Sequence, residues 1–176
     1  GTFSVAVADA ATNVVTTTVS VFGNTIGLAA KPDGSKVYAA GGSGTIKIID
    51  TATNTFGGFI FSSGMGSILF PQRVAFNPSG TRAYVANAPF TNMAVVDTAG
   101  TPAVSANVSA GYTGLVVSPD GTRVYVGNGL GPPGFLADVG VVAATTHTML
   151  PGIVVSDAPR EVALHLFIRR EIFVCL

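Results

Sequence analysis

A short motif recurs three times along this chain, and it constrains the fold more than any other feature of the sequence. Each copy contains a Pro-Asp-Gly or Pro-Ser-Gly triplet that is followed by a basic residue and a tyrosine. The prolines of the three copies, Pro32, Pro78 and Pro119, are 46 and 41 residues apart. A repeat of this period predicts a fold that stacks copies of one supersecondary unit, as solenoids and propellers do.

The first half of each repeat predicts a β-hairpin. An apolar run enters the triplet, in which proline presets φ for a tight turn and glycine accepts a positive φ. A strand of Val and Tyr character follows the turn, as in Val124-Tyr125-Val126. The three hairpins are expected at residues 28–41, 74–87 and 115–128.

The second half of each repeat predicts two more strands. An apolar strand ends in aspartate, and a turn containing Thr and Asn leads into a fourth strand, as in residues 45–61. Related segments begin at residues 5, 93 and 139, and in the last of them Ala143 replaces the aspartate. Each repeat therefore supplies four strands, which is the content of one propeller blade.

The aspartates of the repeats are expected to have structural roles. Asp33 and Asp120 lie in the hairpin turns, whereas Asp9, Asp50 and Asp97 end strands. Side chains of this type accept hydrogen bonds from nearby backbone amides in turns. No spacing in the sequence indicates two carboxylates that face each other across a cleft, as a glycosidase requires.

Taken together, the two halves of the repeat resemble the YVTN repeat of β-propeller proteins. The best matches are residues 119–128 for the first half and 46–54 for the second, and the resemblance extends from Val5 to about Val155. It implies an all-β propeller of four-stranded antiparallel blades. It also implies a prokaryotic protein that is extracellular, periplasmic or on the cell surface. WD-repeat propellers match less well, because the chain contains no tryptophan.

A single propeller domain of about four blades is expected over residues 1–176. Complete blades are expected at about 28–61, 74–108 and 115–155, with a partial blade at 1–22 and a partial or degenerate blade at 162–176. If the two partial blades pair, the chain forms a closed ring. If they do not, the chain is an open arc or a fragment of a longer propeller, whose exposed blade edges favour self-association. The sequence leaves both arrangements open.

The composition narrows the classes of partner. The 9 basic and 9 acidic residues cancel, so no basic surface for nucleic acid is expected. The apolar segment 162–176 is interrupted by charged residues at 169–171 and predicts no membrane span. The single cysteine, Cys175, excludes an intramolecular disulfide.

His147 and His165 lie in different repeats, so neither a metal site nor a cofactor is expected.

Two further sets of residues share repeat positions without indicating catalysis. The basic set is expected on an exposed face of the second strand, and the tyrosines are expected to pack between blades. The basic set is Lys36, Arg82 and Arg123, and the tyrosines are Tyr38, Tyr84 and Tyr125.

We predict no catalytic, cofactor-binding or metal-binding residue, and therefore a non-enzymatic protein. The alternative is a fragment or subunit of a lactonase-like or dehydrogenase-like propeller enzyme, which would need a convergent set of His, Glu and Asp.

Loops of irregular length form the candidate contact site. In repeat proteins, insertions map to one rim, which is often the binding face. Such insertions occur at residues 62–70, 87–92 and 128–136. The candidate contact residues there are Met65, Phe90, Asn92, Phe135 and Leu136. The sequence thus favours a binding scaffold for a protein or glycan, and the alternative is that the phenylalanines fold back onto their blades.

Overall fold

The computed structural model of the chain describes residues 3–41, 44–61, 68, 70–88, 92–111, 113–128, 138–155, 161–164 and 172–175. These residues form β-strands, turns and connections, and none of them is helical. The strands are β1 (Ser4–Asp9), β2 (Val14–Ser20), β3 (Gly27–Ala30), β4 (Lys36–Gly41), β5 (Thr45–Asp50), β6 (Thr55–Phe61), β7 (Pro71–Phe76), β8 (Arg82–Asn87), β9 (Asn92–Asp97), β10 (Ala103–Val108), β11 (Leu115–Val117), β12 (Arg123–Asn128), β13 (Asp138–Ala143), β14 (Thr148–Val154), β15 (Glu161–Leu164) and β16 (Ile172–Cys175).

The strands pair in sequence order into antiparallel sheets. Three sheets have four strands each, and we name them blade I (β3–β6), blade II (β7–β10) and blade III (β11–β14). Two further sheets have two strands each, and we name them the N-terminal half-blade (β1–β2) and the C-terminal half-blade (β15–β16). The fold is therefore the all-β assembly of four-stranded blades that the repeat predicts.

Each sheet that contains a fourth strand has an irregularity where that strand pairs with the third. In blade I the register shifts between Ile48 and Ile49, and in the N-terminal half-blade it shifts between Val7 and Ala8. In blade II the register shifts at the equivalent place, between Val104 and Ala106 of β10, and in blade III it shifts earlier along the third strand, between Val139 and Val141. A bulge increases the local twist of a strand, so each of these sheets is more twisted where its outer strand pairs.

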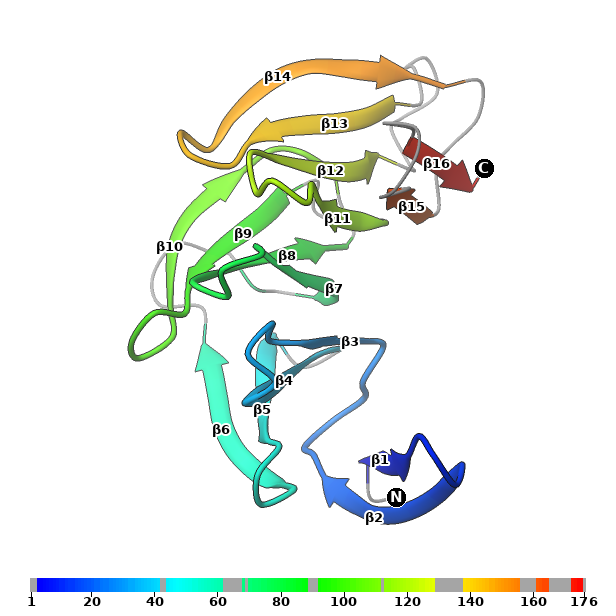
Figure 1. Cartoon of the computed structure of the whole chain (residues 1–176). Helices are drawn as coiled ribbons and strands as arrows, with labels where there is room; N and C mark the ends of the chain where they lie inside the picture. Colours follow the sequence, from blue (N-terminus) through cyan, green and yellow to red (C-terminus); the bar gives the residue numbers. More distant parts are fainter. Residues whose placement is uncertain are drawn as a thin grey trace.

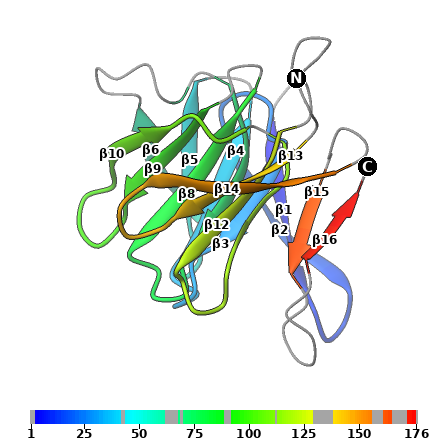
Figure 2. The ribbon, with the colours of Figure 1, turned by 90° about the horizontal axis from the view of Figure 1, so that it is seen from above.

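The blades follow one another along an open arc (Figure 1). The first strands β3, β7, β11 and β15 lie on the concave side of the arc, and the outer strands β6, β10 and β14 lie on the convex side. The two half-blades are at opposite ends and do not pair with each other. The ring is thus not closed, and Figure 2 shows the same blades from above.

The hydrophobic cores lie between neighbouring blades. One cluster joins Tyr38 and Ile46 of blade I to Val85 of blade II. Another joins Tyr84 of blade II to Val126 of blade III. Burial of one large aliphatic side chain stabilises a fold by about 1.5–3 kcal/mol. The contacts between blades therefore hold each blade in its place.

The three repeat tyrosines occupy these cores, as predicted. Tyr38, Tyr84 and Tyr125 are 3%, 1% and 9% exposed. The ring of Tyr38 lies 4.9 Å from that of Phe76 in blade II, and Tyr125 packs in a cluster with Val162 of the C-terminal half-blade. Burial raises the pKa of Tyr38 to about 12, which keeps its hydroxyl neutral.

Candidate binding rim

The ends of the strands form two edges of the arc. We call the edge that carries the hairpin turns the turn rim. Its turns connect the first strand of each blade to the second, and the third strand to the fourth. We call the opposite edge the loop rim. It carries the connections between second and third strands and the connections between blades. Antiparallel pairing places the two rims on opposite edges, because each strand runs from one to the other.

The Pro-x-Gly turns of the turn rim are closed by internal hydrogen bonds. Gly34, Gly80 and Gly121 have φ of +72°, +67° and +69°. The amide of each glycine donates to a backbone carbonyl three residues earlier, at 2.8–2.9 Å. These residues form β-turns that need a positive φ, which explains why glycine is present in every copy.

Carboxylates reinforce the first and third of these turns. Asp33 Oδ1 accepts hydrogen bonds from the amide and the hydroxyl of Ser35, at 2.9 and 2.6 Å. Asp120 Oδ1 accepts from the hydroxyl of Ser118 at 2.6 Å and from the amide of Thr122 at 3.0 Å. These bonds lower the pKa of both Asp33 and Asp120 to about 2, with the serine hydroxyl as the main cause in each case.

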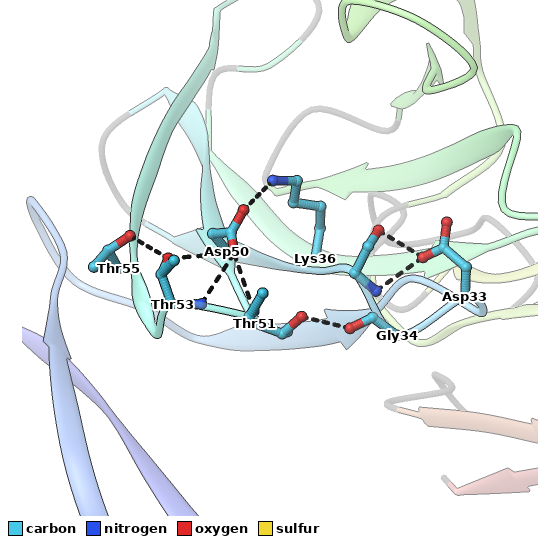
Figure 3. Close-up of polar contacts among 9 residues, drawn as sticks. Asp33, Gly34, Lys36, Asp50, Thr51, Thr53 and Thr55 are labelled. Carbon is cyan, nitrogen blue, oxygen red and sulfur yellow. Dashed lines mark hydrogen bonds and ion pairs between the residues drawn. The ribbon is translucent and has the colours of Figure 1, made fainter.

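The turn from the third to the fourth strand is capped in the same manner (Figure 3). Asp50 Oδ1 accepts from the amides of Ala52 and Thr53, at 3.0 and 3.2 Å, and Asp50 forms an ion pair with Lys36. The hydroxyl of Thr51 donates to the carbonyl of Gly34 at 2.6 Å and so joins the two turns of blade I. The predicted structural role of the repeat aspartates is confirmed here.

The same turn in blade III has lost this cap. Ala143 and Ala144 stand where blade I has Asp50 and Thr51, and His147 has a φ of +57°. Arg82 of blade II reaches this turn, and its guanidinium donates to the carbonyl of Ala144 at 3.0 Å. Burial lowers the pKa of His147, and the nearby charge of Arg82 adds to this effect.

The basic residues of the second strands therefore do not form one uniform surface. Lys36 binds Asp50 within its own blade, and the guanidinium of Arg82 lies 3.4 Å from His147 Nε2 in the next blade. Arg123 is exposed, whereas Lys36 and Arg82 are partly buried. The sequence predicted an exposed row, and only Arg123 fits that description fully.

Lys47 is a buried ammonium group that sequence reasoning missed. It is 0% exposed, and its Nζ donates to the carbonyl oxygens of Asn24 at 2.9 Å and Gly41 at 3.2 Å. Burial lowers the pKa of Lys47. The equivalent residues of the other repeats are small: Ala6, Ala94 and Gly140. Lys47 thus links blade I to the segment that follows the N-terminal half-blade.

The loop rim differs from the turn rim in its polar chemistry. Asn92 begins β9 opposite Asn87, and Asn128 ends β12 opposite Asp138. The Oδ1 atoms of Asn92, Asn128 and Asp138 are buried, and among the described residues they accept no hydrogen bond. A buried acceptor without a partner costs about 1–3 kcal/mol, so its presence in a fold calls for an explanation.

The structure describes one of the five predicted contact residues. Asn92 begins β9 on the loop rim and is partly buried, and its role as a contact residue stays a prediction. Met65, Phe90, Phe135 and Leu136 lie outside the described residues. Sequence reasoning missed Asn128 and Asp138. The signal available for Asn128 was its match in the repeat to Asn87, both of which end a second strand before a long loop.

Two other kinds of feature are absent from the described part of the chain. No group of three or more His, Cys, Asp or Glu side chains that could hold a metal ion occurs among the described residues. None of the described residues belongs to a helix with the length and apolar character that a membrane crossing requires.

Comparison with known proteins identifies the fold. No family model and no curated protein matches the chain. A chain of hydrazine synthase from Kuenenia stuttgartiensis matches with a TM-score of 0.77 and 22% identity, over 92% of this chain. The β-propeller domain of Cps50 (Swd1) from Myceliophteria thermophila matches with a TM-score of 0.62 and 9% identity, over 78% of this chain. The protein has a β-propeller fold. It spans 46% of the length of each of these two chains.

Proposed function

We propose that the chain is a YVTN-type propeller module that acts as a non-enzymatic binding scaffold and takes its ligand at the loop rim. The observation that carries the proposal is the contrast between the two rims. On the turn rim, side chains such as Asp33, Asp50 and Asp120 accept hydrogen bonds from their own turns. On the loop rim, the buried oxygens of Asn92, Asn128 and Asp138 lack such donors among the described residues.

The chemistry of these oxygens indicates a polar ligand. Amide and carboxylate oxygens accept hydrogen bonds from hydroxyl and amide groups, which glycans and polypeptides both carry. The oxygens lie at strand ends, and sites on rigid elements hold their geometry better than sites on free loops. The ligand is therefore a glycan or an extracellular protein, in keeping with the exported or cell-surface location that the YVTN resemblance implies.

An enzymatic role has less support. Local hydrogen bonds hold the carboxylates of Asp9, Asp33 and Asp120 in their turns and lower their pKa values. The pKa of Asp50 is lowered mainly by its hydrogen bond with Lys36 and further by the amides of its turn. A general acid would need a raised carboxyl pKa instead. The similarity to hydrazine synthase, at 22% identity, indicates a shared fold and gives no evidence of a shared activity.

An array experiment with matched variants tests this function. The purified chain is applied to an array of neutral and acidic oligosaccharides and to a panel of extracellular proteins. The variant Asn92→Leu/Asn128→Leu replaces both amides by apolar groups of similar size. We expect it to lose saturable binding while it keeps or gains stability, because unpaired acceptors are removed. The turn-rim variant Thr101→Ala is the control and retains binding. Equal binding by all three proteins contradicts the proposal.

A further inference from the structure

Arg82 connects blade II to blade III at the turn rim. Its guanidinium donates to the carbonyl of Ala144 at 3.0 Å and lies 3.4 Å from His147 Nε2. A guanidinium has N–H donors and no acceptor. Its contact with Nε2 is therefore favourable only while this nitrogen carries no proton and can accept a hydrogen bond. A proton on Nε2 would bring two positive charges into contact, which disfavours the charged imidazole.

The histidine is an exception at its position in the repeat. Asn13 and Asn54 occupy the equivalent position in the N-terminal half-blade and in blade I. Their φ values are +55° and +51°, and that of His147 is +57°. Asparagine is among the residues that adopt this left-handed conformation most readily. The turn of blade III thus keeps the backbone conformation of the repeat and has a titratable ring where the other two turns have a neutral amide.

Arg82 also has an oppositely charged neighbour within its own blade. Asp97 lies directly opposite Arg82 in the register of β8 and β9. The equivalent pair in blade I, Lys36 and Asp50, forms an ion pair. Among the described residues Arg82 and Asp97 form no ion pair, and the guanidinium is directed at blade III. Blade I therefore shows which partner Arg82 can bind when it leaves His147.

Arg82 is the charged group in contact with the imidazole among the described residues. His147 is partly buried, and burial is the main cause that lowers its pKa, with the charge of Arg82 as a second cause. Arg123 of β12 is exposed to solvent, and Asp120 is hydrogen-bonded within its own turn. Burial raises the pKa of Tyr84, so its hydroxyl is neutral. The turn that contains the histidine, residues 143–148, has no acidic or other basic residue.

We propose that Arg82 is a pH-sensitive link between blades II and III. While His147 is neutral, the guanidinium holds the turn of blade III through Ala144 and the imidazole. When Nε2 takes up a proton from solvent, Arg82 leaves this turn and forms an ion pair with Asp97 of its own blade. The contact between the two blades at the turn rim is therefore weaker in acid than at neutral pH.

An NMR titration follows the imidazole and the guanidinium in one sample. We expect His147 to titrate below 6.5 and the Nε–H resonance of Arg82 to shift with the same midpoint. In Arg82→Gln the midpoint of His147 rises, because the adjacent charge is removed. In His147→Asn, which has the residue of the equivalent turns, the Arg82 resonance does not shift in this range. His165 is present in every protein compared, so its own titration does not distinguish them.

A double-mutant cycle identifies the partner of Arg82 on either side of that midpoint. It compares wild type, Arg82→Gln, Asp97→Asn and the double variant, and the coupling is the part of their effects that is not additive. On the alkaline side we expect the two substitutions to change the unfolding equilibrium constant independently. On the acidic side we expect a coupling of about two- to fivefold in this constant, as for a partly exposed ion pair. In the His147→Asn background no coupling appears on either side.

The opposite results overturn the proposal. If Arg82→Gln leaves the midpoint of His147 unchanged, the two groups do not interact. If the coupling is equal on both sides of the midpoint, Arg82 does not change its partner. If His147 stays neutral down to pH 3.8, the ordinary pKa of an aspartyl carboxyl, the fold has no acidic state in which Asp97 binds the guanidinium. An Arg82 resonance that shifts equally in His147→Asn assigns the change to another group, and this readout decides the proposal even if Arg82→Gln does not fold.

Discussion

Gly121 of blade III lies directly against Pro78 of blade II. A Cβ atom on Gly121 would be 3.1 Å from Cδ of Pro78, and one on Gly80 would be 3.2 Å from Cδ of Pro32. The proline and the glycine of each Pro-x-Gly triplet thus have two roles. Within a blade they form the turn, and between blades the glycine of one turn packs on the proline of the turn before it.

This contact predicts unequal effects of two similar substitutions. Gly34→Ala and Gly121→Ala both place a side chain at positive φ, which destabilises a fold by about 1–2 kcal/mol. At Gly34 the new Cβ meets nothing within 4 Å, whereas at Gly121 it meets Pro78. We expect Gly121→Ala to lower the free energy of unfolding more than Gly34→Ala does, as measured by denaturant titration. Equal losses would show that the turns of neighbouring blades do not pack as described.

The lowered pKa values of Asp33 and Asp120 predict an acid-sensitive turn rim. Hydrogen bonds lower both from an ordinary value of 3.8 to about 2. A carboxyl group whose folded pKa is depressed stabilises the fold above its unfolded pKa, and this stabilisation is lost as pH falls through the folded value. We expect the melting temperature to fall between pH 3.8 and pH 2. The variant Asp33→Asn/Asp120→Asn should show a flatter profile in this window. If the melting temperatures of wild type and variant fall in parallel, Asp33 and Asp120 do not cause the acid sensitivity.

Two substitutions of Lys47 separate the effect of its charge on stability from the effect of its buried volume. Lys47→Met keeps most of the aliphatic side chain, and removal of a buried charge is often neutral or stabilising. Lys47→Ala also removes buried methylene groups, at about 0.8 kcal/mol each. We therefore expect Lys47→Met to unfold close to wild type and Lys47→Ala to be less stable by about 2–3 kcal/mol. If Lys47→Met is as unstable as Lys47→Ala, the bonds from Nζ to the two carbonyls contribute more than the packing.

The same residue predicts a response to alkaline pH. A lysine whose folded pKa is lowered below 10.5 binds its proton less tightly in the folded state than in the unfolded state. The contribution of this residue to stability therefore rises as pH increases from the folded pKa toward 10.5. We expect this rise in wild type and its absence in Lys47→Met, measured by chemical unfolding across the alkaline range. A rise of the same size in both proteins would show that another group causes it.

The uncapped turn of blade III predicts a stabilising substitution. Arg123 pairs with Ala143 in register as Lys36 pairs with Asp50 in blade I. Ala143→Asp restores the carboxylate that caps the turn and places it beside Arg123. We expect a gain of about 0.5–1 kcal/mol in the free energy of unfolding. Adding Arg123→Ala to the Ala143→Asp variant should remove part of this gain. If the full gain remains without Arg123, it comes from the capped turn alone.

The sequence predicts those parts of the fold that depend on local chemistry. Pro78-Ser79-Gly80 predicts its turn because proline and glycine restrict the backbone directly, and the period of the repeat predicts the blade. The burial of Lys47 could not be predicted, because its partner Asn24 lies 23 residues away in a connecting segment. The acceptors of Asn128 and Asp138 come together only when β12 and β13 pair across a long loop. The open arc depends on the rotation between blades, which no local motif encodes.

Amide hydrogen exchange can show whether ligands bind at the loop rim. Exchange is measured at residue resolution with and without the best oligosaccharide or protein from the array. We predict added protection at residues 41–45, 87–92 and 128–138, and unchanged exchange in the turns at 31–35, 77–81 and 118–122. Protection that appears in those turns, and not at the ends of β8, β9, β12 and β13, would contradict ligand binding at the loop rim.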